Sequence, residues 1–265
     1  MSEPAQTNPV AAAVARLTGR LQLTEATEAI ELVAGFIDAQ GAVRFAGMLA
    51  ETPAPVGAGA ARDAAQIEHG LLAGLADIER RLEDAFTHAF RPRYRLPGAA
   101  RAWATLGQFG LLESEDLDPT ALRKASRLLW RPFGEFLETQ LKRLRFGLRD
   151  LRAEAGADLR GLGAAAAELV DLDGALVVAT AGVLDRLHRR IGPALEGRFE
   201  ASLREALEAK ARRRDLTTFT AGFGAEGWLG EIVEDAAVLY RALLRREGQR
   251  LVELVKSAAA LRVDP

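Results

Sequence analysis

A long apolar stripe between Trp130 and Leu151 constrains the fold of this chain more than any other feature. The stripe consists of Trp130, Phe133, Leu137, Leu141, Leu144, Leu148 and Leu151. The intervals are three and four residues, which places these side chains on one face of an α-helix that packs along another helix. The sequence therefore predicts a long helix with a continuous packing face.

The composition extends this prediction to the rest of the chain. Ala, Leu, Arg and Glu dominate the 265 residues, whereas Ile and Thr are scarce and there are only 2 Tyr. The abundant residues are strong helix formers, and the scarce ones are favoured in strands. We therefore predict an all-α protein. Its C-terminal half is expected to be an elongated, antiparallel, coiled-coil-like bundle, joined to a smaller helical N-terminal part.

The N-terminal part contains two stretches with helical periodicity, at 24–49 and 62–90. They are separated by a segment rich in Pro, Gly and Ala at 52–61, which is typical of a linker. The second stretch stops before Pro92, and a shorter helix is expected at 99–112. We interpret residues 1–115 as one N-terminal helical region with Pro/Gly-rich linkers.

The C-terminal part begins at Asp118-Pro119, an N-cap aspartate followed by proline at the first helical position. This pair predicts a helix from 119 to about 154, which carries the apolar stripe. Further helices are expected at 159–190, 195–207 and 228–261, with a break at Gly192-Pro193 and a loop at 214–227. We interpret residues 116–265 as a bundle of long helices.

Several function classes are excluded or disfavoured by composition. The chain has no Cys, which excludes disulfides, thiolate catalysis and Cys-ligated metal centres. The N-terminal residues lack the pattern of a signal peptide, and the longest uncharged apolar stretch is too short for a spanning helix, which needs about 20 residues. We therefore expect a cytoplasmic protein without a transmembrane segment, and a peripheral location at the inner membrane stays open at the level of sequence.

No motif predicts an enzyme, a cofactor or a metal site. The sequence between Gly222 and Gly227 matches G-x-G-x-x-G, but a dinucleotide loop needs a paired strand before it, and the segment from Leu216 has no second strand to pair with. His88 follows Asp84 by four residues, and His188 follows Asp185 by three, without the Glu-x-x-His motif of di-iron bundles. We predict no enzymatic activity, no cofactor and no metal.

The helix predicted after residue 119 is strongly basic on its polar side. Between Leu122 and Arg152 there are nine basic residues and three acidic ones, although the net charge of the whole chain is −2. Such a face can be solvated, pair with acidic residues of neighbouring helices such as Glu196 and Glu200, or bind an anionic partner. These alternatives stay open at the level of sequence.

We predict that the chain is a non-enzymatic helical adaptor or scaffold that binds a protein partner or a second copy of itself. The alternative is a binder of nucleic acid or of an anionic membrane surface through the basic face at 122–152, with nucleic acid the less favoured partner. The residues proposed for the binding surface are Trp130, Lys142, Arg145, Arg149, Arg152, Trp228 and Tyr240.

Several short motifs are similar to those of a known family. They include Trp130-Arg-Pro-Phe133 followed by Gln140, Leu172-Asp173, Leu195-Glu-Gly-Arg-Phe-Glu200, and Trp228 with Ile232 and Asp235. In this combination the chain resembles a proteobacterial family of helical proteins defined by the domain of unknown function 3348. Pro193 is one residue away from the family's proline, and Phe36 and Ile37 replace tryptophans usual in the first helical region.

The resemblance implies no activity. It implies a cytoplasmic protein encoded near envelope components, including OmpA-like proteins. From this association we expect partners in an envelope-associated assembly, without any inference about mechanism.

Overall fold

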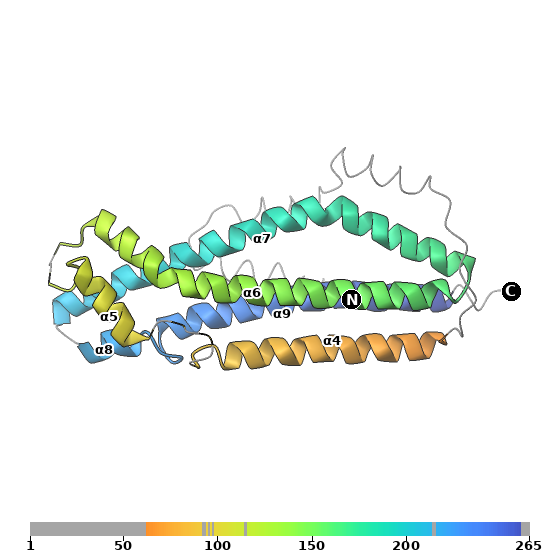
Figure 1. Ribbon diagram of the computed structural model, residues 1–265, viewed down its shortest axis with the longest axis horizontal. Helices are drawn as coiled ribbons and strands as arrows, with labels where there is room; N and C mark the ends of the chain where they lie inside the picture. The colour runs from red at the N-terminus through yellow and green to blue at the C-terminus, as the bar shows by residue number, and fades with distance from the viewer. Residues whose placement is uncertain are drawn as a thin grey trace, which may run out of the picture. The chain divides into compact units, whose positions relative to one another are not determined.

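The computed structural model describes residues 62–91, 94, 96, 98–113, 116–213 and 216–260, and within the helices it leaves the side chains of 179–180, 182–188, 210–213 and 216–218 undescribed. The described residues form helices and no strand (Figure 1). The prediction of an all-α helical bundle is confirmed. The helix expected at 24–49 and the linker at 52–61 lie outside the described residues.

The helices are α4 (Ala64–Thr87), α5 (Ala99–Gln108), α6 (Pro119–Arg160), α7 (Ala164–Arg213), α8 (Leu216–Ala221) and α9 (Trp228–Ala260). α6 has 42 residues, which is about 63 Å at 1.5 Å per residue. Among the described helices, none has the combined length and apolarity that crossing a membrane requires.

These helices build two compact units from non-contiguous segments. The described residues of the first unit lie in 62–81, 143–188 and 240–260, and the second unit comprises 82–142 and 189–239. Each of α4, α6, α7 and α9 contributes one part to each unit. The boundary expected near residue 115 therefore does not separate compact units, because helices distant in sequence pack together in both of them.

The start of α6 follows from local hydrogen bonding. Asp118 accepts hydrogen bonds from the backbone N–H of Thr120 (3.0 Å) and of Ala121 (3.2 Å), and Pro119 occupies the first helical position. This N-cap satisfies donors that have no partner inside the helix. The helix start predicted at Asp118-Pro119 is confirmed.

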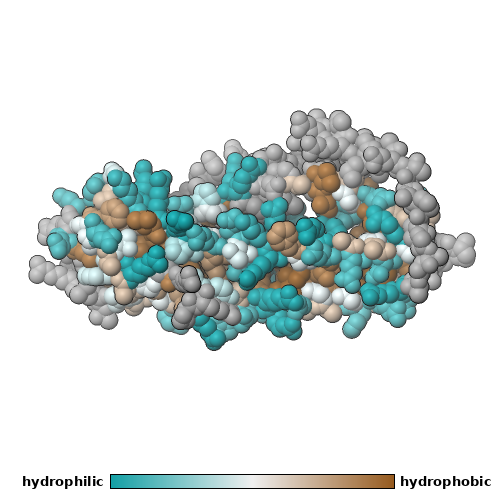
Figure 2. Space-filling model, viewed as in Figure 1, coloured by the Kyte–Doolittle hydropathy of each residue, from teal (hydrophilic) through white to brown (hydrophobic). Residues whose placement is uncertain are grey.

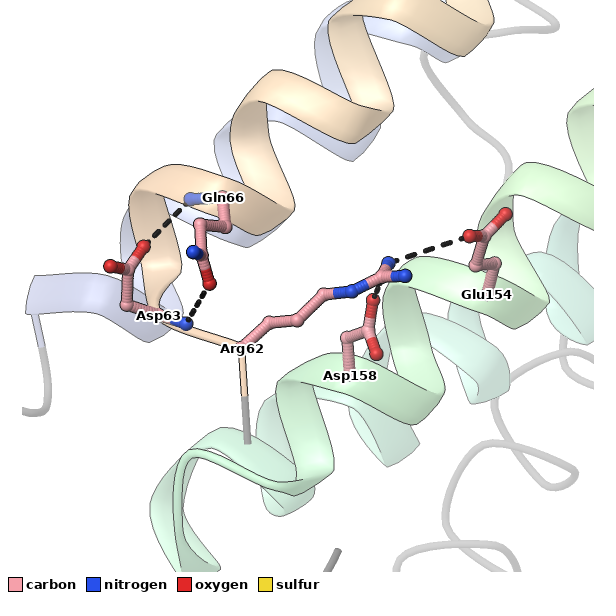
Figure 3. A network of polar contacts seen from close by, with 5 residues as sticks. All are labelled: Arg62, Asp63, Gln66, Glu154 and Asp158. Atoms are coloured by element: carbon pink, nitrogen blue, oxygen red, sulfur yellow. Dashed lines mark hydrogen bonds and ion pairs between the residues drawn. The ribbon is translucent and has the colours of Figure 1, made fainter. Parts of the chain in front are cut away.

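The start of α4 is a reciprocal cap, shown in Figure 3. Asp63 Oδ1 accepts from the N–H of Gln66 (2.8 Å), and Gln66 Oε1 accepts from the N–H of Asp63 (3.1 Å). The neighbouring Arg62 forms ion pairs with Asp158 (2.9 Å) and Glu154 (3.5 Å) of α6. The capping box thus lies where α4 is also joined to α6.

Helix ends depend on two glycines with positive φ. α5 ends in a Schellman motif, in which Gly110 (φ 68°) donates to Gly107 and Leu111 donates to Leu106. Gly163 (φ 141°) separates α6 from α7. The helix predicted to end near 154 continues to Arg160. Leu159, predicted to start the next helix, is a fully buried residue of α6.

The break predicted at Gly192-Pro193 is wrong, because α7 continues from Ala164 to Arg213 with Pro193 inside it. Proline removes one backbone hydrogen bond and disfavours a helix interior. The residues that follow, Leu195, Phe199 and Leu203, are all buried, so tertiary packing holds the helix beyond the proline.

The first unit has a well-defined apolar core. It contains Ile67 and Leu71 of α4, Leu159 of α6, Val170 of α7, and, from α9, Leu251, Val255 and Ala258. Partly buried side chains such as Leu75 and Leu151 pack against this core. The alternation of threes and fours on α4 and α9 accounts for these contacts, because it gives each helix one apolar stripe.

Candidate binding surface and the buried side chains beneath it

The core of the second unit is aromatic. Phe199 of α7 contacts Trp130, Phe133 and Trp228, with ring centroids 5.5, 5.9 and 5.4 Å apart. Trp228 also contacts Phe223 at 5.1 Å. Trp130 and Phe133, at the start of the apolar stripe of α6, therefore pack against α7 within the protein.

Three residues proposed for the binding surface lie in or against these cores. Trp130 is 6% exposed and Tyr240 is 2% exposed, and Trp228 is half-buried between Phe199 and Phe223. The prediction that they lie on a partner-binding surface is wrong for Trp130 and Tyr240, which are buried, and Trp228 packs against the core with its ring. Large aromatic rings bury much apolar area, so core packing is the stronger physical demand on them.

The G-x-G-x-x-G segment is a tight turn between two helices. Residues Leu216–Ala221 form α8, so no strand precedes the turn. The N–H groups of Phe223, Gly224 and Gly227 donate to carbonyls of Thr220, Ala221 and Gly224, so they are already used within the turn. A dinucleotide loop needs such donors to be available for phosphate.

Close packing explains the glycines of this turn. A Cβ at Gly222 would overlap the indole of Trp228, and one at Gly227 would lie 2.5 Å from backbone atoms of Ala221 and Gly222. The indole Nε1 of Trp228 is buried with no hydrogen-bond partner in the described chain. The glycines of this motif therefore leave room for the indole of Trp228 at the start of α9.

Charged residues inside the second unit join α7 to α9. Arg198 is 9% exposed and forms an ion pair with Asp235, itself 6% exposed, and a longer contact of 3.5 Å with Glu231. A buried charge is tolerated only when it is paired in this way.

The first unit contains a larger charge network on α6, α7 and α9. Asp173 receives Arg152 Nε at 3.0 Å on one carboxylate oxygen and Arg250 at 2.9 Å on the other. Arg152 also contacts Glu247 at 3.4 Å. The Arg152 side chain is 22% exposed, so this residue, predicted for the binding surface, belongs instead to the interior of the unit.

Sequence reasoning missed this network because its members are far apart in the chain. The signals available were Asp173 among apolar residues of α7 and Arg250 next to Leu251 of α9. Neither signal identifies the partner, since Arg152 and Glu247 are separated by 95 residues.

The remaining proposed residues are exposed on α6. Lys142 pairs with Glu138 (2.7 Å), and Arg149 pairs with its neighbour Asp150 (2.9 Å). Arg149 also lies over the ring of Phe146, 4.9 Å from its centroid, and Arg145 is exposed nearby. Pairs of this kind between exposed residues contribute about 0–1 kcal/mol and are readily exchanged for a partner's charges.

Four other cations on α6 are exposed and form no ion pair in the part of the chain that the structure describes: Arg123, Lys124, Arg127 and Arg143. The first three lie on adjacent turns around Leu128, whose side chain is 53% exposed. We call Arg123, Lys124, Arg127 and Leu128 the basic strip. Pairing with the acidic residues of α7, one of the alternatives open from sequence, does not occur for these cations.

Apolar exposure on the described helices is limited. The large exposed hydrophobic residues are Leu72, Leu128, Phe146 and Val178, and Phe146 is the one exposed aromatic residue of the described chain. On the face shown in Figure 2, hydrophobic patches are interspersed among hydrophilic residues. Leu128 and Phe146 are distinguished from the other two by exposed cations next to them on α6.

No group of three or more His, Asp or Glu side chains suited to a metal ion occurs among the residues with described placement. His88 contacts Asp84 at 2.8 Å within α4 and its following turn, as their spacing suggested. The pair at Asp185 and His188 has no described side chains.

Comparisons with models of known protein families, with curated proteins and with solved structures gave no match. The resemblance to a helical proteobacterial family therefore stays a prediction that these comparisons do not test.

Proposed function

We propose that this protein is a non-enzymatic helical adaptor that binds a partner protein through exposed residues of α6. The observation that carries the proposal is the exposure of Leu128 and Phe146, each accompanied by exposed cations on the same helix. Aromatic side chains and Arg are enriched at protein-binding surfaces, where exposed apolar side chains become buried.

The interior of each unit supports the same proposal. Ion pairs join the helices inside each unit, Arg198–Asp235 in the second and Arg152–Asp173 in the first. These charged groups therefore hold the helices of each unit together. Within each unit, helices joined in this way hold the exposed residues of that unit in defined positions, which is what recognition of another protein requires.

We further propose that the protein works in the cytoplasm as part of an envelope-associated assembly. This follows from the family resemblance alone, which associates such chains with genes for envelope components. A second copy of the chain is the alternative partner.

Affinity capture from the native host tests the proposal. The tagged full-length chain should capture a defined protein, and Leu128→Asp with Phe146→Asp should remove that protein from the eluate. The matched control is Leu72→Asp, which alters an exposed leucine, 48% exposed, on α4. The proposal fails if the purified chain is a monomer and captures no protein, or if the double variant captures as much as the control.

A further inference from the structure

The basic strip is spaced in a way that is unfavourable for an isolated helix. Arg127 lies four residues after Arg123, three after Lys124 and four before Arg131, so like charges are neighbours on the helix surface. Further along α6 the same intervals join opposite charges, as in Arg131–Glu135 (2.9 Å) and Lys142–Glu138 (2.7 Å).

Within α6, ion pairs between opposite charges four residues apart are therefore present in the middle of the helix and absent from the basic strip. Arg123, Lys124 and Arg127 also find no acidic group from another helix of the described chain. Like charges that destabilise a helix, with no contact that offsets their repulsion, are expected where the residues serve a function. An anion supplied from outside would offset this repulsion.

The exposed leucine of the strip favours a helix that carries carboxylates over a phosphate backbone. Residues four apart rise about 6 Å along α6, the same interval at which a second helix presents its own residues four apart. Leu128, 53% exposed, adds an apolar contact that a phosphate backbone would leave without a counterpart.

Two other anionic partners fit less well. The strip has no aromatic side chain on which bases could stack, which single-stranded nucleic acids use for binding. An anionic membrane surface is bound by a broad apolar face inserted between lipids or by a cluster of about four to eight cations, and the strip offers one leucine and three cations.

We infer that the basic strip binds an acidic amphipathic helix of a partner protein, with Leu128 against its apolar residue and Arg123 and Arg127 against its carboxylates. This inference rests on the proposed function, since it specifies the chemistry of the adaptor's partner. It concerns the second unit alone and needs no contribution from Phe146.

The test uses the full-length chain and two designed helical peptides. One carries glutamates four residues apart beside leucines, and the other carries lysines in place of the glutamates. Binding is measured by fluorescence anisotropy at low and high salt, with a single-stranded oligonucleotide and anionic phosphatidylglycerol vesicles as competing ligands. The variants are Arg123→Glu with Arg127→Glu, Leu128→Ala, and the control Arg143→Glu, which changes an exposed and unpaired cation elsewhere on α6.

The expected result is binding of the acidic peptide that weakens about tenfold or more in the double variant and stays nearly unchanged in the control. The double variant should in turn bind the lysine peptide, and Leu128→Ala should weaken binding without altering its dependence on salt. Equal losses in the double variant and the control, or tighter binding to the oligonucleotide or the vesicles, would overturn the inference. If host capture still yields a protein that the double variant retains, the adaptor function survives and only this inference fails.

Discussion

Asp173 is the residue on which the stability of the first unit should depend most sharply. Its side chain is 9% exposed and receives the guanidinium groups of Arg152 at 3.0 Å and Arg250 at 2.9 Å. Asp173→Ala leaves two cations, 22% and 30% exposed, without their shared anion.

The magnitude follows from this geometry. Removing one member of a buried ion pair costs about 3–5 kcal/mol, because the remaining charge stays desolvated. Arg152 retains Glu247 at 3.4 Å, and both arginines keep some contact with water, so we expect the lower end, about 3 kcal/mol. Asp173→Asn keeps one carbonyl oxygen to accept from a guanidinium and should cost less than Asp173→Ala.

Urea unfolding followed by far-UV circular dichroism measures these changes. The control is Asp150→Ala, which removes an exposed partner of Arg149 and should cost less than about 1 kcal/mol. The predicted order of destabilisation is Asp173→Ala, then Asp173→Asn, then Asp150→Ala. If Asp173→Ala and Asp150→Ala destabilise equally, the network contributes nothing beyond surface pairing, and the reasoning is refuted.

Three further substitutions test other parts of the fold by the same unfolding assay. Ser126→Ala should stabilise by about 1 kcal/mol, because Ser126 Oγ is buried without a hydrogen-bond partner in the described chain; a loss of stability would show an overlooked partner. Gly222→Ala should destabilise by about 1–3 kcal/mol and shift tryptophan fluorescence, since its Cβ would overlap the indole of Trp228; an unchanged spectrum would contradict that packing. Asp118→Ala should cost about 1 kcal/mol through loss of the α6 N-cap, and a neutral effect would show that the cap is dispensable.

Local features of the fold could be predicted because their causes are local. The Asp118-Pro119 cap and the start of α9 at Trp228 lie where the sequence places them. Pro193 misleads because its cost is local, whereas the packing of Leu195 and Phe199 that outweighs it is tertiary. The compact units do not divide at the predicted boundary near residue 115, because they are assembled from distant segments.

The binding surface could be predicted only in part. The excess of basic residues on α6 is visible in the sequence, but the sequence does not show which of them are paired. Arg152 is held by Asp173 and Glu247, whereas Arg127 has no partner in the described chain. Trp130 has the residue type of an interface anchor, and its burial depends on Phe199, which lies 69 residues further along the chain.

Photocrosslinking in living host cells tests the adaptor function most directly. A photoreactive amino acid would be placed singly at Leu128, at Phe146 and, as control, at Leu72, all of which are exposed. The account predicts adducts with the same partner protein at Leu128 and Phe146 in clear excess over Leu72. Equal labelling at the three positions, or adducts consisting only of nucleic acid or lipid, would contradict it.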